Sequence, residues 1–312
     1  MTAAAAPVAD QRLACGVWPE GAAFVGGRYL RAEEASVPIG DWGFLHSDAT
    51  YDVVHVWEGA FFRLEEHLDR FYRGMAALRM SLSVTRDEIR AILVECVRLS
   101  GLRHAYVEMI CTRGLPAPGS RDPRSAVNRF YAFAVPFVWL ADPAKQEVGL
   151  HLAVGKAVRI PPASVDPRIK NYHWLDLVTG LFEAYDQGAE TTVLTDGEGH
   201  VVEGPGFNLF LLRGGTLLTP RTGMLEGITR RTVLEIAAEL GIPSDVRAVR
   251  TQELHDADEV FATSTAGGVV PICRIEGRPV GTGVPGATTR LIRERYWRWH
   301  DLAPHRTEVN YA

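Results

Sequence analysis

Arg168-Ile169-Lys170-Asn171-Tyr172-His173-Trp174 places a lysine among apolar and aromatic residues, just before a predicted helix over residues 174–187. Lysine occurs at only three positions in the chain, 145, 156 and 170. Burial among such neighbours lowers the pKa of an amine and exposes a neutral nucleophile, as Schiff-base formation with an aldehyde requires. An exposed loop lysine is the commoner arrangement, so this interpretation of Lys170 depends on the rest of the chain.

A candidate acid follows downstream in the stretch Glu203-Gly204-Pro205-Gly206-Phe207-Asn208, which leads into a predicted strand over residues 207–212. A carboxylate before a glycine-rich turn is able to face a pocket. The alternative is an exposed glutamate in an ordinary turn.

Two segments are suited to binding an anion such as phosphate. Gly223-Met224-Leu225-Glu226-Gly227-Ile228-Thr229-Arg230 lies directly before an amphipathic helix predicted over residues 229–240, where free N–H groups and the helix dipole favour negative charge. Thr263-Ser264-Thr265-Ala266-Gly267-Gly268 offers hydroxyl groups and flexible backbone. Arg70, on the polar face of a helix predicted over residues 64–80, is able to add a charge-assisted bond. Ordinary caps, turns and solvated arginines are the alternatives.

Composition restricts the class of function. The chain has 312 residues, of which 46% are hydrophobic and 23% charged, so it is long enough for two globular domains. A net charge of -5 without a basic stripe argues against nucleic acid and favours small-molecule chemistry. Cys15, Cys96, Cys111 and Cys273 lack metal-ligand spacing, so we expect reduced cysteines and no metal site. Without a signal peptide or a membrane-spanning stretch, we expect a cytoplasmic protein.

Hydrophobic periodicity predicts an α+β fold in two domains. We expect a smaller N-terminal domain over residues 1–140, a linker over residues 141–146 and a larger, mixed β-barrel-like domain over residues 147–312. In the first domain we expect a hairpin over residues 22–30, helices over 64–80 and 85–100, and strands over 104–112 and 130–138 separated by a long loop. In the second we expect strands over 150–158 and 207–212 and helices over 174–187, 229–240 and 287–299.

Five motifs follow one another in this order: His67-x-x-Arg70, Lys170, Glu203-Gly-x-Gly-x-Asn208, Leu225-x-Gly227-x-Thr229-Arg230 and Thr265-Ala266-Gly267-Gly268. Together they resemble the class IV aminotransferases, which are pyridoxal-phosphate enzymes of fold type IV. The similarity runs from about Phe24 to about Trp299 and implies that fold, with a C-terminal pseudo-barrel domain that binds the cofactor.

The resemblance implies roles for the candidate residues. Lys170 becomes the Schiff-base and proton-transfer residue, and Glu203 the partner of the pyridine nitrogen, which keeps the ring an electron sink. The phosphate is expected at Arg70, Ile228, Thr229, Ser264 and Thr265. Branched-chain enzymes of the family carry a tyrosine shortly after the lysine, whereas Trp174 and Leu175 occupy that stretch here, so the group that contacts the phenolic oxygen stays open.

Further segments look like the (R)-selective amine transaminases within the family. They are Gly43-Phe44-Leu45-His46-Ser47-Asp48, Thr50-Tyr51-Asp52-Val53, Tyr106-Val107-Glu108, Thr112-Arg113-Gly114 and Val165-Asp166-Pro167. At the position of Glu108 the branched-chain enzymes typically hold an arginine that receives a substrate carboxylate. A glutamate repels that carboxylate, so a neutral substituent is expected there.

The resulting hypothesis is a ping-pong transamination from a primary amine, expected in the (R) configuration, to a keto acid such as pyruvate. The expected substrate pocket is formed by His46, Tyr51, Tyr106, Glu108 and Trp174, with Arg121 of the loop over residues 114–128 receiving the keto-acid carboxylate, although Arg124 is an alternative. The resemblance also implies a homodimer. A branched-chain or D-amino acid aminotransferase, an aminodeoxychorismate-type lyase and a cofactor-free binding protein remain alternatives.

Overall fold

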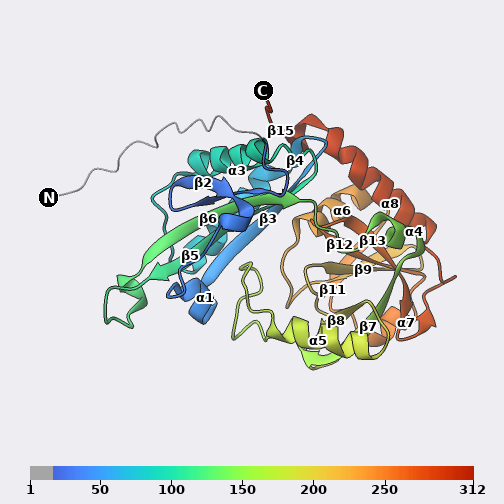
Figure 1. The fold of residues 1–312 in the computed structure, drawn as a ribbon. Helices are drawn as coiled ribbons and strands as arrows, with labels where there is room; N and C mark the ends of the chain where they lie inside the picture. The colour runs from blue at the N-terminus through green and yellow to red at the C-terminus, as the bar shows by residue number, and fades with distance from the viewer. Residues whose placement is uncertain (1–16) are drawn as a thin grey trace.

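The computed structural model describes residues 17–312, which form two β-sheets with helices packed against them (Figure 1). The first sheet has seven strands in the order β15-β4-β3-β5-β6-β1-β2, and each neighbouring pair is antiparallel. The second sheet has eight strands in the order β11-β10-β9-β12-β13-β7-β8, with β14 beside β13, and mixes parallel and antiparallel pairs. The predicted α+β class and two-part architecture are confirmed.

The first sheet is built mainly from the N-terminal half of the chain. Its strands are β1 (Ala22–Val25), β2 (Arg28–Arg31), β3 (Ala49–Trp57), β4 (Ala60–Phe62), β5 (Ala105–Leu115), β6 (Val127–Pro136) and β15 (Arg306–Glu308). The helices that accompany it are α1 (Trp42–His46), α2 (Leu64–Ala77) and α3 (Arg86–Ser100), with short 3-10 turns at Ala32–Glu34 and Pro123–Ser125.

Helices α2 and α3 cover one face of this sheet because each carries an apolar stripe. Leu68 and Phe71 of α2 and Leu93 of α3 are fully buried in a common core with the sheet. The predicted capping box opens α3: the Thr85 hydroxyl accepts from the Glu88 N–H, and the Glu88 carboxylate accepts from the Thr85 N–H.

The second sheet follows in the chain. Its strands are β7 (Leu150–Val158), β8 (Thr191–Thr195), β9 (Asn208–Arg213), β10 (Thr216–Pro220), β11 (Ser244–Arg247), β12 (Glu259–Ser264), β13 (Gly268–Ile275) and β14 (Arg278–Pro279). The helices are α4 (Pro143–Val148), α5 (Leu175–Asp186), α6 (Ile228–Glu239), α7 (Thr251–His255) and α8 (Ala287–Arg298), followed by 3-10 turns at Trp299–Asp301 and Ala303–His305.

The two sheets are not joined by an extended linker. The residues expected to form it, 141–146, overlap α4, which begins at Pro143 with the Asp142 carboxylate accepting from the Lys145 N–H. At the other end of the chain, β15 returns to the first sheet and pairs with β4. The proposed division into residues 1–140 and 147–312 therefore leaves one strand of the first sheet in the second part. No helix within residues 17–312 combines the length and apolar composition needed to cross a membrane.

Candidate active site

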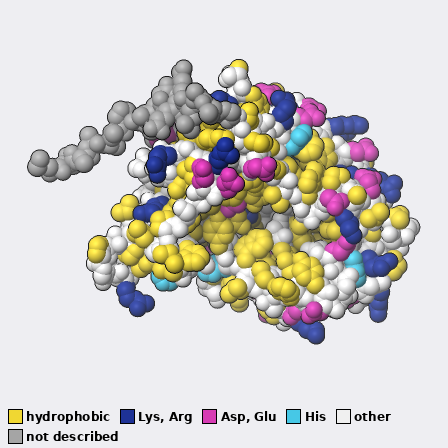
Figure 2. Space-filling view, in the orientation of Figure 1, with side chains coloured by type: hydrophobic (Ala, Val, Ile, Leu, Met, Phe, Trp, Pro, Cys, Tyr) yellow, Lys and Arg dark blue, Asp and Glu magenta, His cyan; other side chains and the backbone are white. Residues whose placement is uncertain are grey.

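A cavity of about 690 Å³ lies between the two sheets. Its wall comes from β3 and β5 of the first sheet, from the segment before α5, and from the turns around β9, α6 and β12. Figure 2 shows the hollow, with hydrophobic side chains gathered around it. Ten of the predicted cofactor and substrate residues line the cavity: Tyr51, Arg70, Tyr106, Lys170, Trp174, Glu203, Ile228, Thr229, Ser264 and Thr265.

Lys170 is held at the cavity by the neighbouring strand β3. Its carbonyl oxygen accepts hydrogen bonds from the Thr50 hydroxyl at 2.9 Å and from the Tyr51 N–H at 3.1 Å. Its Nζ lies 4.4 Å from the centroid of the Tyr51 ring, within the range of a cation–π contact. The backbone is thus fixed by the first sheet, while the amine is presented to the cavity over an aromatic face.

Glu203 presents a buried carboxylate to the same cavity. Its side chain is 9% exposed; Oε1 accepts from Arg159 Nε at 3.0 Å, and Oε2 accepts from the Leu225 N–H at 3.0 Å. Burial raises the pKa of Glu203, while Arg159, the Leu225 N–H and the Lys170 ammonium offset part of that increase. A buried carboxylate that keeps free acceptor capacity is suited to a protonated ring nitrogen.

Helix α6 points its N-terminus at the cavity. Gly227 is its N-cap with φ -63° and ψ 136°, and within residues 17–312 no side chain caps this end. The N–H groups of the first turn, which includes the cavity residues Ile228 and Thr229, are therefore available to an anion. A Cβ at position 227 would lie 2.1 Å from Asn208 Oδ1, so any larger residue there would displace the Asn208 side chain. The Asn208 amide in turn donates to the Leu225 carbonyl at 2.8 Å and fixes the approach to the helix.

Arg70 reaches the same end of the cavity from α2. Its Nε and Nη2 donate to Asp52 of β3 at 2.7 and 2.9 Å, and its Nη1 donates to the Glu226 carbonyl at 3.2 Å, directly before α6. His67 Nδ1 lies 2.7 Å from the same Asp52 carboxylate. Burial would raise the pKa of Asp52, but Arg70 and His67 overcome it and hold that pKa well below its usual range. The guanidinium is therefore locked by a charged partner beside the free N–H groups of α6.

Ser264 and Thr265 complete this region from the end of β12. The Ser264 hydroxyl donates to the Gly206 carbonyl at 2.8 Å and accepts from the Ala266 N–H at 3.1 Å, so it stabilises the turn that carries Thr265. Both residues line the cavity.

Three tyrosines and a glutamate form a cluster beside Lys170. The rings of Tyr51 and Tyr172 stack with centroids 4.2 Å apart. The Tyr172 hydroxyl donates to Glu108 Oε1 at 2.6 Å, and the Tyr106 hydroxyl donates to Oε2 at 3.3 Å. Burial raises the pKa of Glu108, and the Tyr172 bond and Lys170 offset part of the increase. Tyr51 and Tyr106 line the cavity, whereas Glu108 and Tyr172 are not part of its wall.

Two other predicted substrate residues also lie outside the cavity wall. His46 is exposed at the end of α1, with its ring 4.8 Å from that of Trp42. Arg121 is exposed in the loop after β5, and Arg124 in the same loop is paired with Asp122 at 2.6 Å. Neither arginine contributes to the wall.

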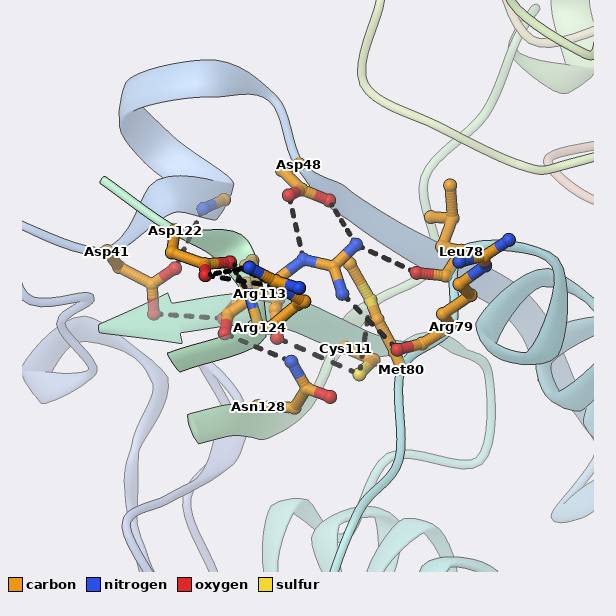
Figure 3. Close-up of polar contacts among 12 residues, drawn as sticks. Asp41, Asp48, Leu78, Arg79, Met80, Cys111, Arg113, Asp122, Arg124 and Asn128 are labelled. Carbon is orange, nitrogen blue, oxygen red and sulfur yellow. Dashed lines mark hydrogen bonds and ion pairs between the residues drawn. The ribbon is translucent and has the colours of Figure 1, made fainter. Parts of the chain in front are cut away.

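Arg113 anchors the base of that loop (Figure 3). Its Nε and Nη2 donate to the Asp48 carboxylate at 2.8 and 3.0 Å, and Nη2 also donates to the Leu78 carbonyl at 2.8 Å. The Asn128 amide donates to the Arg113 carbonyl at 3.0 Å from the strand on the other side of the loop. The stem of the loop is therefore tied to the first sheet, while Arg121 stands beyond these bonds.

Three further residues that shape the site, Asp52, Tyr172 and Arg159, are not among the predicted site residues. Asp52 lies in a segment that resembles the (R)-selective amine transaminases, Tyr172 lies in the apolar and aromatic stretch around Lys170, and Arg159 directly follows the predicted strand over residues 150–158. Tyr172, two residues after Lys170, supplies a tyrosine in the stretch where none was assigned, but its hydroxyl is bonded to Glu108. A charge placed directly after a buried strand was the available signal for Arg159.

The groups around the cavity fit pyridoxal phosphate. An amine, a buried carboxylate and a free helix N-terminus beside a guanidinium match an aldehyde, a pyridine nitrogen and a phosphate. A family model described as "Amino-transferase class IV" matches residues 49–275. This chain belongs to the class IV aminotransferases.

Individual members of the family align over most of the chain. It is 32% identical over 253 residues to a branched-chain-amino-acid aminotransferase of Pseudomonas aeruginosa, covering 80% of this chain and 81% of the relative. It is 29% identical over 270 residues to a D-alanine aminotransferase of Bacillus licheniformis, covering 86% and 93%. The solved branched-chain amino acid aminotransferase from Thermobaculum terrenum, in its PLP-bound holo-form, superposes with a TM-score of 0.81 at 28% identity, covering 94% and 99%. The chain is accordingly a transaminase that uses pyridoxal 5'-phosphate.

Proposed function

We propose that this class IV aminotransferase transfers the amino group of a primary amine, in the (R) configuration, to a keto acid such as pyruvate. The observation that carries the proposal is Glu108, a buried carboxylate that accepts hydrogen bonds from Tyr106, a residue of the cavity wall, and from Tyr172. The (R) configuration is supported by the segments shared with (R)-selective amine transaminases.

The environment of Glu108 disfavours a second carboxylate. The hydroxyls of Tyr106 and Tyr172 both donate to Glu108, and Tyr106 also lines the cavity, so neither hydroxyl is free to donate to a substrate carboxylate. A methyl or aryl substituent carries no charge that Glu108 would repel and needs no hydrogen bond there. The wall thereby favours an amine without an α-carboxylate.

Each of the proposed site residues has a separate role in the reaction. Bound pyridoxal phosphate supplies an aldehyde that exchanges with the amino group and a ring that withdraws electrons. The Lys170 amine would hold the aldehyde of the bound cofactor, and as a free amine it would move a proton to or from the substrate carbon. Glu203 keeps the ring nitrogen protonated. Arg70 and the first turn of α6 hold the phosphate, with Ser264 shaping the turn that carries Thr265.

A branched-chain or D-amino acid aminotransferase is the second candidate, favoured by the names of the relatives. An aminodeoxychorismate-type lyase is the third, and it would turn over without an amino acceptor. For the keto acid of the second half-reaction we propose Arg121, which reaches the cavity if the tip of its loop moves while the Arg113 anchor stays in place.

We also propose a homodimer. Phe44 and Leu45 of α1 are 68% and 53% exposed, and Leu175 and Phe182 of α5 are 84% and 65% exposed. Monomeric proteins rarely leave such large apolar side chains in water when they gather into patches. In a dimer, His46 of α1 is available to the partner's cavity instead of its own. Sedimentation equilibrium tests this assembly.

A cytoplasmic location completes the proposal. Within residues 17–312, Cys96, Cys111 and Cys273 are buried and form no disulfide, which suits a reducing compartment. Cys15 lies outside the described residues.

The proposal is tested by adding (R)- and (S)-1-phenylethylamine separately to the holoenzyme without acceptor and following the absorbance of the bound cofactor. Conversion to pyridoxamine phosphate by the (R) amine, and not by the (S) amine, is expected. Conversion by leucine or D-alanine but by neither amine would identify an amino acid aminotransferase instead.

A variant tests the role of Glu108 in the same assay. Glu108→Gln removes the charge and keeps the shape, so kcat/KM for D-alanine is expected to rise about tenfold relative to that for the amine, which corresponds to about 1.4 kcal/mol. Glu198→Gln, at an exposed turn, is the control and leaves the ratio unchanged. An unchanged ratio in Glu108→Gln would remove the basis for the amine preference.

A further inference from the structure

We propose that Arg159 and Asp176 are positioning residues for Glu203, and that they hold its carboxylate ionised and correctly oriented at the pyridine nitrogen. This inference rests on the proposed role of Glu203 in the transaminase. It assigns a function to two residues that lie behind the groups that touch the cofactor.

The carboxylate of Glu203 is fixed at both oxygens by groups on separate elements. Arg159, which follows β7, donates from Nε to Oε1 at 3.0 Å, and the Leu225 N–H donates to Oε2 at 3.0 Å. Arg159 is fixed in turn, because its own N–H donates to the Thr195 carbonyl at the end of β8. The orientation of the carboxylate plane is therefore set by two strand ends and by the turn that leads to α6.

Asp176 completes the arrangement from the first turn of α5. Its Oδ2 accepts from Arg159 Nη1 at 2.7 Å and from the Ile160 N–H at 2.8 Å. A negative charge in the first turn of a helix is favoured by the helix dipole. The side chains of Arg159 and Asp176 are only 11% and 10% exposed, so the pair is weakly screened by solvent. One guanidinium thus bridges two carboxylates and cannot rotate away from Glu203 without losing both.

The bridge determines where a proton shared between Glu203 and a ring nitrogen resides. Burial favours the neutral form of Glu203, and the charges that oppose it are Arg159 and Lys170, together with the Leu225 N–H. Lys170 is the residue proposed to react with the aldehyde, so its amine would not remain a fixed charge during the reaction. Arg159 takes no part in the chemistry, so its positive charge stays beside Glu203 throughout and would keep the carboxylate ionised and the proton on the ring.

The test uses holoenzyme reconstituted with pyridoxal phosphate labelled with ¹⁵N in the ring, and records the ¹⁵N resonance of the pyridine nitrogen. In the wild type and in Arg159→Lys, which keeps the charge, the resonance of a protonated ring is expected. In Arg159→Gln it moves toward the unprotonated value, and in Asp176→Asn it moves by a smaller amount. We expect kcat of Arg159→Gln to fall by roughly ten- to a hundredfold, the usual loss when an outer partner of an active-site ligand is removed.

Two further variants separate the possible failures. Arg113→Gln is the matched control, since Arg113 is also a largely buried arginine paired with an aspartate, and it leaves the ¹⁵N resonance unchanged. If Glu203→Gln moves the resonance and Arg159→Gln does not, the positioning role is overturned while the role of Glu203 stands. If Glu203→Gln itself leaves the resonance in place, the proposed contact with the ring fails, and this inference fails with it. Should Arg159→Gln not fold, Asp176→Asn decides the question, because an unchanged resonance there also overturns the role of the bridge.

Discussion

The two ends of the cavity each contain a buried pair of an arginine and a carboxylate, but with the parts exchanged. At the α6 end the arginine, Arg70, faces the cavity and Asp52 stands behind it. At the other end the carboxylate, Glu203, faces the cavity and is held by Arg159, whose far side is bound to Asp176. The same ion-pair chemistry therefore presents a cation to one part of a ligand and an anion to another.

The two carboxylates differ in how completely they are satisfied. Asp52 accepts four hydrogen bonds, two from Arg70 and one each from His67 and the Val53 N–H, which is about the capacity of a carboxylate. Glu203 accepts two, one on each oxygen. Correspondingly the pKa of Asp52 lies well below its usual range, whereas that of Glu203 is raised. A buried carboxylate whose hydrogen-bond acceptors are all used stabilises the fold, whereas one with unused acceptors is available to bind a ligand.

The largest effect is expected from breaking the satisfied pair. Asp52→Asn leaves Arg70 buried without its counter-charge, so the free energy of unfolding of the apoenzyme should fall by about 3–5 kcal/mol. Urea denaturation at pH 7 measures the loss.

Two variants serve as controls for Asp52→Asn. Removing both charges in Asp52→Asn/Arg70→Gln should restore part of the stability, since no uncompensated charge remains. Asp166→Asn, at the exposed pair with Arg168, should cost less than about 1 kcal/mol. If Asp52→Asn lowers the free energy of unfolding no more than Asp166→Asn does, the pair of Asp52 and Arg70 does not stabilise the fold as proposed.

A smaller effect should separate the two ends by the ligand each one binds. Arg70→Gln removes a charge-assisted bond to phosphate, so the affinity of the apoenzyme for pyridoxal phosphate should fall roughly ten- to a hundredfold. The affinity for pyridoxal, which lacks the phosphate, should stay unchanged. Glu203→Gln, at the other end, should weaken both ligands by the same factor. Titration of the apoproteins gives these dissociation constants, and equal losses for both ligands in Arg70→Gln would place the phosphate elsewhere.

The groups that face the cavity could be predicted from sequence because short local patterns encode them. Lys170 lies in an apolar stretch before a helix, Glu203 lies before a glycine turn, and Ile228 and Thr229 lie where a helix begins. Each pattern is contained within a few residues, and the resemblance to the family indicated that these residues belong to one site. All four residues line one cavity.

The supporting groups could not be predicted, because their partners are distant in sequence. β3 was not recognised as a strand since Thr50, Asp52 and His55 interrupt its apolar run, although all three are buried. Two of them contact residues far along the chain: the Thr50 hydroxyl donates to the Lys170 carbonyl, and His55 Nε2 lies 2.7 Å from His300 Nε2. Contacts between residues so far apart in sequence can be identified only once the fold is known.

The smallest expected effect concerns stability and has opposite signs at the two ends. Because the pKa of Glu203 is raised above its unfolded value of 4.5, the folded apoenzyme binds that proton more tightly than the unfolded chain does. Glu203 therefore costs stability as the pH rises through its folded pKa, and Glu203→Gln should stabilise the apoenzyme at pH 7 by roughly 0.5–2 kcal/mol and have almost no effect at pH 4. Asp52, whose folded pKa is lowered, contributes stability at pH 7 that is lost only as the pH falls below about 4. Urea denaturation at both pH values compares the variants, with Glu198→Gln as an exposed control that changes neither value. Destabilisation of the apoenzyme by Glu203→Gln at pH 7 would mean that the Arg159 bridge outweighs burial, and that both carboxylates serve structure in the same way.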